Sequence, residues 1–308
     1  MKESNIAIII INWNTYHLSF SCLKSLQACT YKNKTVFFID NGSNDGSGDK
    51  IAHEFPEINY IKNDKNEGFT GANNKALKAI LKQNFEYVLL LNNDTEVTPN
   101  FLSLLESRMD SDKNLAATQP VILNFLNKKT IWNAGGSFNT FFGLSKTRSK
   151  GIVYKPKLKI RKFTDWISGC CILVKTQAIK EVGLLDNCFF AYFEDVDWSI
   201  RMKNQGYKLG VVPKSIIYHH SSGSTKKNNT SNEGNLSPYA HYLNVRNHIY
   251  LIKKHPLFFN SIGSWIYQIL KIASYSIYFI LRGRFEKFKM VWRGVSDGIK
   301  IKNIKHTV

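Results

Sequence analysis

The sequence contains few cysteines, and their spacing suits neither a cross-linked framework nor a zinc site. Five cysteines occur in 308 residues, an odd number, and no two of them form a CxxC pair. Small disulfide-linked domains and cysteine zinc sites both depend on regular spacing of this kind. We therefore expect a protein of a reducing, cytoplasmic compartment.

We also expect no secretory leader, and the sequence contains none of the common glycine-rich phosphate loops. Its first apolar run, residues 6–11, stops at Asn12 and is too short for the apolar region of a signal peptide. The turn that follows, residues 12–16, contains no glycine, and no GxxxxGKS/T pattern occurs anywhere. These absences argue against a nicotinamide-dependent enzyme and a P-loop NTPase.

Acidic residues are scarce relative to basic ones. The chain carries 42 Lys and Arg against 23 Asp and Glu, a formal net charge of +19. Residues 240–308 hold twelve of the basic residues and two acidic ones, so about half of the excess lies in the last quarter. A nucleic acid, an anionic lipid surface and a phosphate-rich substrate would all suit this charge, which does not distinguish among them.

Short apolar runs alternate with helical patterns over much of the chain. Because the runs are continuously apolar, they predict strands of a mostly parallel α/β sheet that is covered by helices on both faces. The predicted strands are residues 6–11, 36–39, 59–61, 87–91, 116–122 and 170–174, with two short ones ending at Val212 and Tyr218; the predicted helices are 18–27, 47–54, 71–83, 101–109, 175–182 and 194–205, and residues 124–164 predict a loop-rich insertion.

A polar cluster follows each of the first four predicted strands. Ligands of parallel sheets bind beyond the carboxyl ends of the strands, so four clusters at one edge would form a single site. Each cluster taken alone is explained equally well as an ordinary turn, because Asn, Asp and Gly are turn formers. The clusters are residues 12–16, 40–45, 63–70 and 92–96.

Three of these loops carry recognisable motifs in a fixed order: IDNGSNDGS at residues 39–47, NEGFTGANN at 66–74 and LNNDT at 91–95. This series resembles the family 2 glycosyltransferases of the GT-A fold, and the resemblance covers roughly the first 225 residues. It implies a mostly parallel, Rossmann-like sheet sandwiched by helices in a catalytic domain of residues 1–235. The nucleotide-sugar half would be about 1–122 and the acceptor half about 165–235, followed by a basic helical region, 236–308.

The resemblance places the donor nucleotide against the first three loops. Asp40 would contact the base, since a carboxylate can accept the imide N–H of uracil or thymine. Gly68 would allow close backbone approach to the ligand, and Asn73 opens a helix where donors are free. Further donor contacts are implied at Asn12, Asn66 and Asn93.

Asn92-Asn93-Asp94 resembles the metal-binding DxD motif of the family, with Asn in place of the first Asp. A divalent metal, Mg²⁺ or Mn²⁺, that bridges two phosphates prefers hard oxygen ligands, so Asp94 should contribute most and Asn92 less. The family also has a metal-binding histidine where this chain has Tyr218-His219-His220. Because successive strand residues face opposite ways, only one of the two histidines should face the metal, and we choose His219.

Phe193-Glu194-Asp195-Val196-Asp197 resembles the ED motif of the family. Inversion at the anomeric carbon needs a base that takes the proton of the acceptor hydroxyl, and the resemblance favours Asp195, with Glu194 supporting it or touching the acceptor. A helix dipole alone would explain one acid in a first turn, but not three. Asp197 is expected in the acceptor or sugar pocket, together with Gly169 and Trp166, although a tryptophan is equally well suited to a core.

The apolar window of residues 262–281 contains Gln268 and Lys271. A charge near the centre of a spanning helix costs roughly 2.5 to 3.5 kcal/mol, so we expect helices that lie on an anionic membrane surface rather than cross it. The alternatives are a helical cap on the catalytic domain and a homodimer contact. The expected location is the inner face of the cell membrane.

The motif variants Asn92-Asn93-Asp94-Thr95 and Glu194-Asp195-Val196-Asp197 resemble those of rhamnosyltransferases. They imply an inverting transfer of rhamnose or another hexose from a dTDP or UDP donor to a glycan or lipid-linked saccharide in cell-surface polysaccharide synthesis. A sugar nucleotidylyltransferase would need a glycine- and arginine-rich loop after the first strand, which is absent. A nucleic-acid-binding protein is the alternative that charge alone allows, and it would need a basic groove with stacking aromatics; we expect no nucleic-acid partner.

Overall fold

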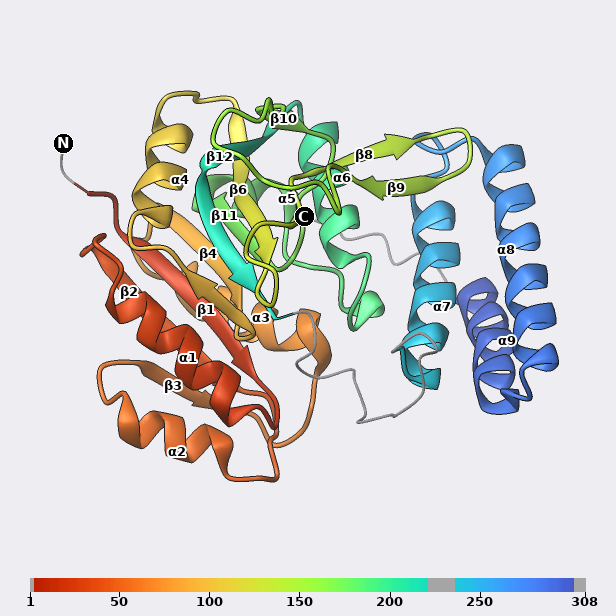
Figure 1. Cartoon of the computed structure of the whole chain (residues 1–308), viewed down its shortest axis with the longest axis horizontal. Helices are drawn as coiled ribbons and strands as arrows, with labels where there is room; N and C mark the ends of the chain where they lie inside the picture. Colours follow the sequence, from red (N-terminus) through yellow and green to blue (C-terminus); the bar gives the residue numbers. More distant parts are fainter. Residues whose placement is uncertain (1–2, 221–235, 302–308) are drawn as a thin grey trace.

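The computed structural model describes residues 3–220 and 236–301 (Figure 1). The strands in these ranges are β1 (Ile6–Asn12), β2 (Lys34–Asp40), β3 (Asn59–Lys62), β4 (Tyr87–Asn92), β5 (Thr95–Val97), β6 (Leu115–Asn124), β7 (Ile131–Asn133), β8 (Gly136–Asn139), β9 (Leu144–Thr147), β10 (Phe163–Thr164), β11 (Cys171–Lys175) and β12 (Lys208–His219). The helices are α1 (Tyr16–Gln27), α2 (Ser47–Glu54), α3 (Gly68–Ile80), α4 (Phe101–Asp110), α5 (Thr176–Val182), the 3₁₀ turn η1 (Asn187–Phe189), α6 (Glu194–Asn204), α7 (Pro238–Lys254), α8 (Ser261–Leu281) and α9 (Phe285–Lys300).

One large sheet forms the centre of the molecule, with strand order β10-β12-β6-β11-β4-β1-β2-β3. β1 pairs in parallel with β2 and β4, β2 with β3, and β6 with β12. β11 runs antiparallel between β4 and β6, and β5 and β7 add antiparallel pairs to β12 and β6. The predicted fold class, a mostly parallel α/β sheet between helices, is confirmed.

Alternate residues of β1 pack into two separate cores, which explains its continuously apolar sequence. Ile6, Ile8 and Ile10 contact the core formed with α1, α2 and α4. Ala7 and Ile9 contact the core formed with α3, α5 and α6. Helices therefore cover both faces of the sheet, and the carboxyl ends of the parallel strands are left for the loops that carry the motifs.

The region between β6 and β11 is more regular than the predicted loop-rich insertion. It contains β7, the β8–β9 hairpin and β10. The two short strands predicted to end at Val212 and Tyr218 are a single strand, β12, whose register shifts between Val212 and Ile216. Pro213 lies within the shift, as expected for a residue that has no N–H to donate to a ladder.

The last three helices, α7, α8 and α9, lie together on one side of the sheet (Figure 1). α7 packs along α9, and both contact α8. Among the described residues, no helix combines the length and the apolarity needed to cross a membrane. The resemblance at Ser221–Ser224 lies outside the described residues, and the boundary at residue 236 stays a prediction.

Candidate active site

The sheet edge brings the ends of β1 and β2 side by side, with Asn12 opposite Asp40. Asn12 is completely buried, and its amide nitrogen lies 3.2 Å from Asp40 Oδ1, 3.1 Å from Ser43 Oγ and 2.8 Å from Ser47 Oγ. Such a buried amide fixes the loop that follows β2. This differs from the expected nucleotide contact, because Asn12 is hydrogen-bonded to Asp40 inside the protein and offers no surface to a ligand.

Asp40 itself is nearly buried, and its surroundings depend on a glycine that the motif reading did not single out. Oδ1 accepts hydrogen bonds from Asn12 and Ser43. A Cβ at Gly48 would lie 2.3 Å from Asp40 Oδ2. Any side chain at residue 48 would therefore displace the carboxylate, so the glycine preserves its position.

The third loop is packed against the acidic motif rather than open to a ligand. Gly68 has φ +72°, and a Cβ there would lie 2.5 Å from the ring of Phe190. The backbone approach that we expected to serve the donor is thus filled by Phe190, whose carbonyl accepts from Thr70 N–H at 3.1 Å. Asn66 Oδ1 accepts from Gly68 N–H at 2.8 Å, and Asn73 is buried and donates to its own helix. Both asparagines shape the loop, and Asn73 offers no free donor.

The Asn-Asn-Asp motif ends β4 beside the loop that precedes β11. Asn92 N–H donates to Cys170 O at 2.9 Å, which brings Gly169 next to the motif. The Asn93 amide donates to Thr15 Oγ1 at 2.7 Å and to Ser19 Oγ at 2.8 Å. Asn93 therefore directs its N–H groups toward α1.

Asp94 and His219 meet because β5 pairs with β12, which places His219 opposite Thr95. His219 Nε2 lies 3.2 Å from Asp94 Oδ1, whereas His220 Nε2 lies 3.5 Å from Glu96. The two histidines face opposite ways, and His219 is the one that faces the motif. Burial lowers the pKa of His219, but Cys170 and Asp94 outweigh it and raise the pKa to about 10.

The donor set at this point suits a divalent metal that is held mainly by a substrate. Asp94 and His219 are both nearly buried and present a carboxylate oxygen and an imidazole nitrogen to each other, with the partly exposed Asn92 at the same strand end. Among the described residues, no group of three or more His, Cys, Asp or Glu side chains could hold a metal alone. Mg²⁺ and Mn²⁺ bound to a diphosphate need only one or two protein ligands, so the residues fit.

The acidic motif begins α6 and lies against Gly169. Gly169 N–H donates to Asp195 Oδ2 at 2.7 Å, and Val196 N–H donates to Oδ1 at 2.8 Å. Burial raises the pKa of Asp195, and the two N–H groups oppose that rise. Asp195 is partly exposed, so its carboxylate is both oriented and accessible.

Glu194 is more deeply placed than Asp195. Its Oε2 atom is buried and, within the described structure, has no hydrogen-bond partner. Burial and the neighbouring Asp195 carboxylate raise the pKa of Glu194 well above its usual range. Two adjacent carboxyl groups resist ionising together, and the deeper burial of Glu194 favours its neutral form.

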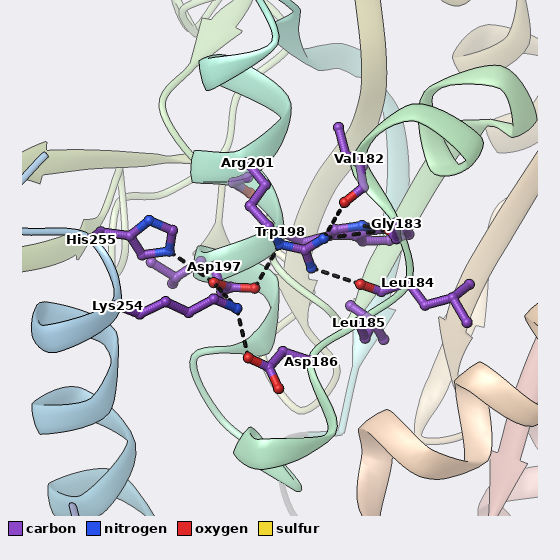
Figure 2. Close-up of polar contacts among 12 residues, drawn as sticks. Val182, Gly183, Leu184, Leu185, Asp186, Asp197, Trp198, Arg201, Lys254 and His255 are labelled. Carbon is purple, nitrogen blue, oxygen red and sulfur yellow. Dashed lines mark hydrogen bonds and ion pairs between the residues drawn. The ribbon is translucent and has the colours of Figure 1, made fainter. Parts of the chain in front are cut away.

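Asp197 does not line a sugar pocket, contrary to the expectation. It is completely buried and binds Arg201 Nε at 2.9 Å, Lys254 Nζ at 2.8 Å and His255 Nε2 at 2.8 Å (Figure 2). Burial opposes ionisation, but His255, Arg201 and Lys254 hold the pKa of Asp197 well below its usual range. The side chain is an anchor for α7, since Lys254 and His255 lie at the end of that helix.

Trp166 takes the core role rather than the sugar-stacking one. It is 7% exposed and packs with Phe189 and Val196. A Cβ at Gly136 would lie 1.9 Å from its indole ring, so the ring lies flat against that glycine. Of the three expected pocket residues, Gly169 is the one that hydrogen-bonds to Asp195.

Residues of α7 complete the surroundings of the acidic motif, and the sequence gave little sign of them. Arg246, Asn247 and Lys254 all bind the segment that leads into α6 or its first turn. Their helix reads simply as basic and apolar. In the sequence, the adjacent polar residues Arg246 and Asn247 within this helical stretch were the available sign of a role beyond packing.

The family is decided by sequence comparison. A family model described as "Glycosyl transferase family 2" matches residues 7–183, more than half of the chain. The chain belongs to this family. It is a glycosyltransferase, as the motifs predicted, and neither the nucleic-acid-binding nor the nucleotidylyltransferase alternative finds support.

Two of the proteins to which the chain is similar are named rhamnosyltransferases. The N-acetylglucosaminyl-diphospho-decaprenol L-rhamnosyltransferase of Mycobacterium tuberculosis is 23% identical over 228 residues, which cover 68% of this chain and 74% of the relative. The dTDP-rhamnosyl transferase RfbF of Shigella flexneri is 23% identical over 257 residues, covering 82% and 81%.

The fold is shared with solved glycosyltransferases. The crystal structure of GalNAc-T7 with UDP, GalNAc and Mn²⁺ superposes with a TM-score of 0.62 at 18% identity, over 82% of this chain. The chain spans about half of that longer protein, 48% of its length. At this identity the likeness shows the GT-A architecture alone.

Proposed function

We propose that this glycosyltransferase moves rhamnose, or a related hexose, from a dTDP or UDP donor onto a lipid-linked glycan, with inversion, at the inner membrane surface. The observation that carries the proposal is the convergence at one sheet edge of Asp40, the Asp94–His219 pair and the oriented Asp195 carboxylate. The names of the two rhamnosyltransferase relatives support the choice of sugar, and the name of the Mycobacterium tuberculosis relative supports a lipid-diphosphate acceptor.

Asp40 supports a pyrimidine donor. Oδ1 accepts from Asn12 and Ser43, so a base would have to bind through Oδ2, the oxygen against which Gly48 packs. The imide N–H of thymine or uracil is a suitable donor to that atom.

Asp94 and His219 would hold a divalent metal, Mg²⁺ or Mn²⁺, with Asn92 as a weaker ligand. When bound, such a metal neutralises the charge of the departing nucleotide diphosphate. The presence of Mn²⁺ in the GalNAc-T7 crystal structure supports this assignment.

Asp195 would be the catalytic base. Its hydrogen bonds from Gly169 and Val196 stabilise the ionised form and fix its direction, while the protonated Glu194 leaves it as the carboxylate of the pair. Asp195 would take the proton of the acceptor hydroxyl as the oxygen attacks the anomeric carbon from the face opposite the nucleotide. Glu194, beside it, would donate to the acceptor or the sugar.

The C-terminal helices would hold the enzyme on an anionic membrane surface. α8 exposes an apolar stripe, and cations surround its carboxyl end, where each cation near an anionic bilayer contributes about 1 kcal/mol. A continuous apolar stripe on a solvated surface would favour association with other molecules. The exposed apolar residues of the stripe are Ile262, Ile266, Ile269, Leu270, Ile277, Ile280 and Leu281, and the nearby cations are Arg282, Arg284, Lys287 and Lys289.

A donor screen tests the catalytic proposal. The purified protein is heated with dTDP-rhamnose, UDP-glucose or GDP-mannose, each with Mn²⁺ or with chelator. A bound ligand at a hundred times its Kd stabilises by about 2.7 kcal/mol, so dTDP-rhamnose with Mn²⁺ should raise the melting temperature and GDP-mannose should not. Stabilisation by GDP-mannose alone, or by no nucleotide sugar, would refute the proposed donor.

A further inference from the structure

The loop that presents the two catalytic carboxyl groups has a strained backbone. Three residues have a positive φ, in the left-handed region that residues other than glycine rarely adopt. They are Phe190, Tyr192 and Phe193, with φ of 62°, 71° and 71°. Such a backbone conformation is strained and persists only where neighbouring groups hold it. Phe193 is the N-cap of α6, so the direction of Glu194 and Asp195 depends on what holds this loop.

The loop is held by α7, a helix about fifty residues further along the chain and outside the stretch matched by the family model. The completely buried Asn247 places its amide nitrogen 2.8 Å from Phe189 O, 2.7 Å from Ala191 O and 2.9 Å from Tyr192 O. These carbonyls belong to the irregular turn and have no helical partner. One side chain therefore lies within hydrogen-bond distance of three backbone carbonyl oxygens of the strained loop.

Neighbouring residues of α7 secure the two ends of the same segment. The Arg246 guanidinium donates to Phe189 O at 3.0 Å, just before the strained residues. Lys254 binds Asp186 Oδ2 at 2.6 Å, ahead of the loop, and Asp197 Oδ1 at 2.8 Å, in the first turn of α6 (Figure 2). The segment from 186 to 197 is thus clamped at both flanks and along its middle by one helix.

We propose that α7 is part of the catalytic apparatus and that Asn247 is a positioning residue, which holds the loop so that Asp195 faces the acceptor hydroxyl. The role of Asp195 in this statement rests on the proposed function. Asn247 is too deeply buried to contact a substrate, so its effect on the reaction is exerted through the carboxylates. Misplacement of a catalytic group by about 1 Å lowers a rate by about a hundredfold.

The test compares Asn247→Ala with a matched control on the same helix, Asn244→Ala. Asn244 is one turn earlier, and among the described residues its amide donates to Ala240 O of α7 alone, at 2.8 Å. In the full-length enzyme, Asn247→Ala should lower kcat about tenfold to a hundredfold, with the KM for the donor and dTDP affinity changed less than threefold. Asn244→Ala should leave kcat within twofold of the wild type.

Hydrogen exchange of the loop amides gives a readout that needs no substrate. Exchange across residues 189–197 should accelerate in Asn247→Ala and stay unchanged in Asn244→Ala. If Asn247→Ala does not fold, Arg246→Lys replaces it in both experiments, because lysine keeps the charge and one donor. This variant should lower kcat and accelerate loop exchange relative to the wild type, by less than is expected for Asn247→Ala.

The outcomes separate this proposal from the proposed function. Wild-type protein that transfers no sugar counts against the proposed function, while faster exchange in Asn247→Ala still supports the clamp. A folded Asn247→Ala variant with unchanged loop exchange, with kcat within twofold of the wild type, or with dTDP affinity lost in parallel with kcat, overturns the positioning role.

Discussion

Lys254→Met should destabilise the protein far more than the loss of an ordinary lysine. The ammonium group lies between two almost completely buried carboxylates, Asp186 and Asp197, at 2.6 and 2.8 Å. Methionine keeps most of the side-chain volume and removes the charge. Removing one partner of a buried ion pair typically costs about 3 to 5 kcal/mol, and here the loss falls mainly on Asp186, because Asp197 keeps Arg201 and His255.

The lowered pKa of Asp186 gives a second measure of how much Lys254 contributes to the free energy of unfolding. Burial alone would raise it, but Lys254, with hydrogen bonds from Cys188 and Tyr250, lowers the pKa from 3.8 to about 2. This depression is worth about 2 kcal/mol of stability, present above pH 4 and lost as the pH falls through about 2. Lys254→Met lacks this contribution, so the stability deficit of the variant should be full above pH 4 and shrink as the pH falls toward 2.

Thermal unfolding measures this effect. For a chain of this length, 3 to 5 kcal/mol corresponds to a fall in Tm of about 5 to 8 °C. The control is Lys289→Met, which breaks the pair with Glu286 on α9, where the side chains are 70% and 74% exposed. Exposed pairs contribute little, so this variant should stay within about 1 °C. Equal Tm values for the two variants, or a deficit independent of pH, would refute the argument.

Three further predictions concern catalysis and location. Asp195→Asn should lower kcat about a hundredfold to ten-thousandfold and leave donor binding intact; if Glu194→Gln shows that pattern instead, the base is Glu194. Asp94→Ala should abolish metal-dependent transfer, and undiminished turnover of this variant in excess chelator would remove Asp94 from the metal site. High salt should release the enzyme from anionic vesicles, and the added charge of Leu270→Glu should weaken its binding to them. Retention in membranes through high salt and alkaline carbonate would instead indicate a spanning segment.

The sequence predicted the sheet well because apolar runs report burial directly. The helix predicted over residues 47–54 coincides with α2, and the first strand extends one residue further, to Asn12. The β8–β9 hairpin was missed, since its strands are short and partly exposed and carry no apolar pattern. The antiparallel direction of β11 was also invisible, because a strand buried on both faces has the same composition in either direction.

The site was predicted less completely than the sheet, for a related reason. Motif order identifies which loops meet at the sheet edge, but not which side chains within a loop point inward. Asn12 and Asn73 proved to be internal braces, and Asp197 proved to be an ion-pair anchor. Residues such as Asn247 are harder still to anticipate, because the contacts that give them a role are made with residues about fifty-five positions away.

Lys271 shows how the position of one charge changes the meaning of a whole helix. In the sequence it interrupts the apolar window of residues 262–281, yet in the structure Lys271 Nζ turns inward to within 2.9 Å of His248 Nδ1. His248 Nε2 lies 2.7 Å from Gly143 O and must donate to it, so Nδ1 is an acceptor. Burial lowers the pKa of Lys271 to about 7, and the outward stripe of α8 is left apolar.

α7 therefore connects the two ends of the proposed activity. One of its residues, His248, binds Lys271 of the helix proposed to face the bilayer, and the adjacent residue, Asn247, binds the loop that carries the catalytic acids. Both side chains are almost completely buried, so both contacts are shielded from water. Under the proposed membrane contact, α7 would therefore connect the proposed catalytic carboxylates to the helix that faces the lipid surface from which the acceptor is presented.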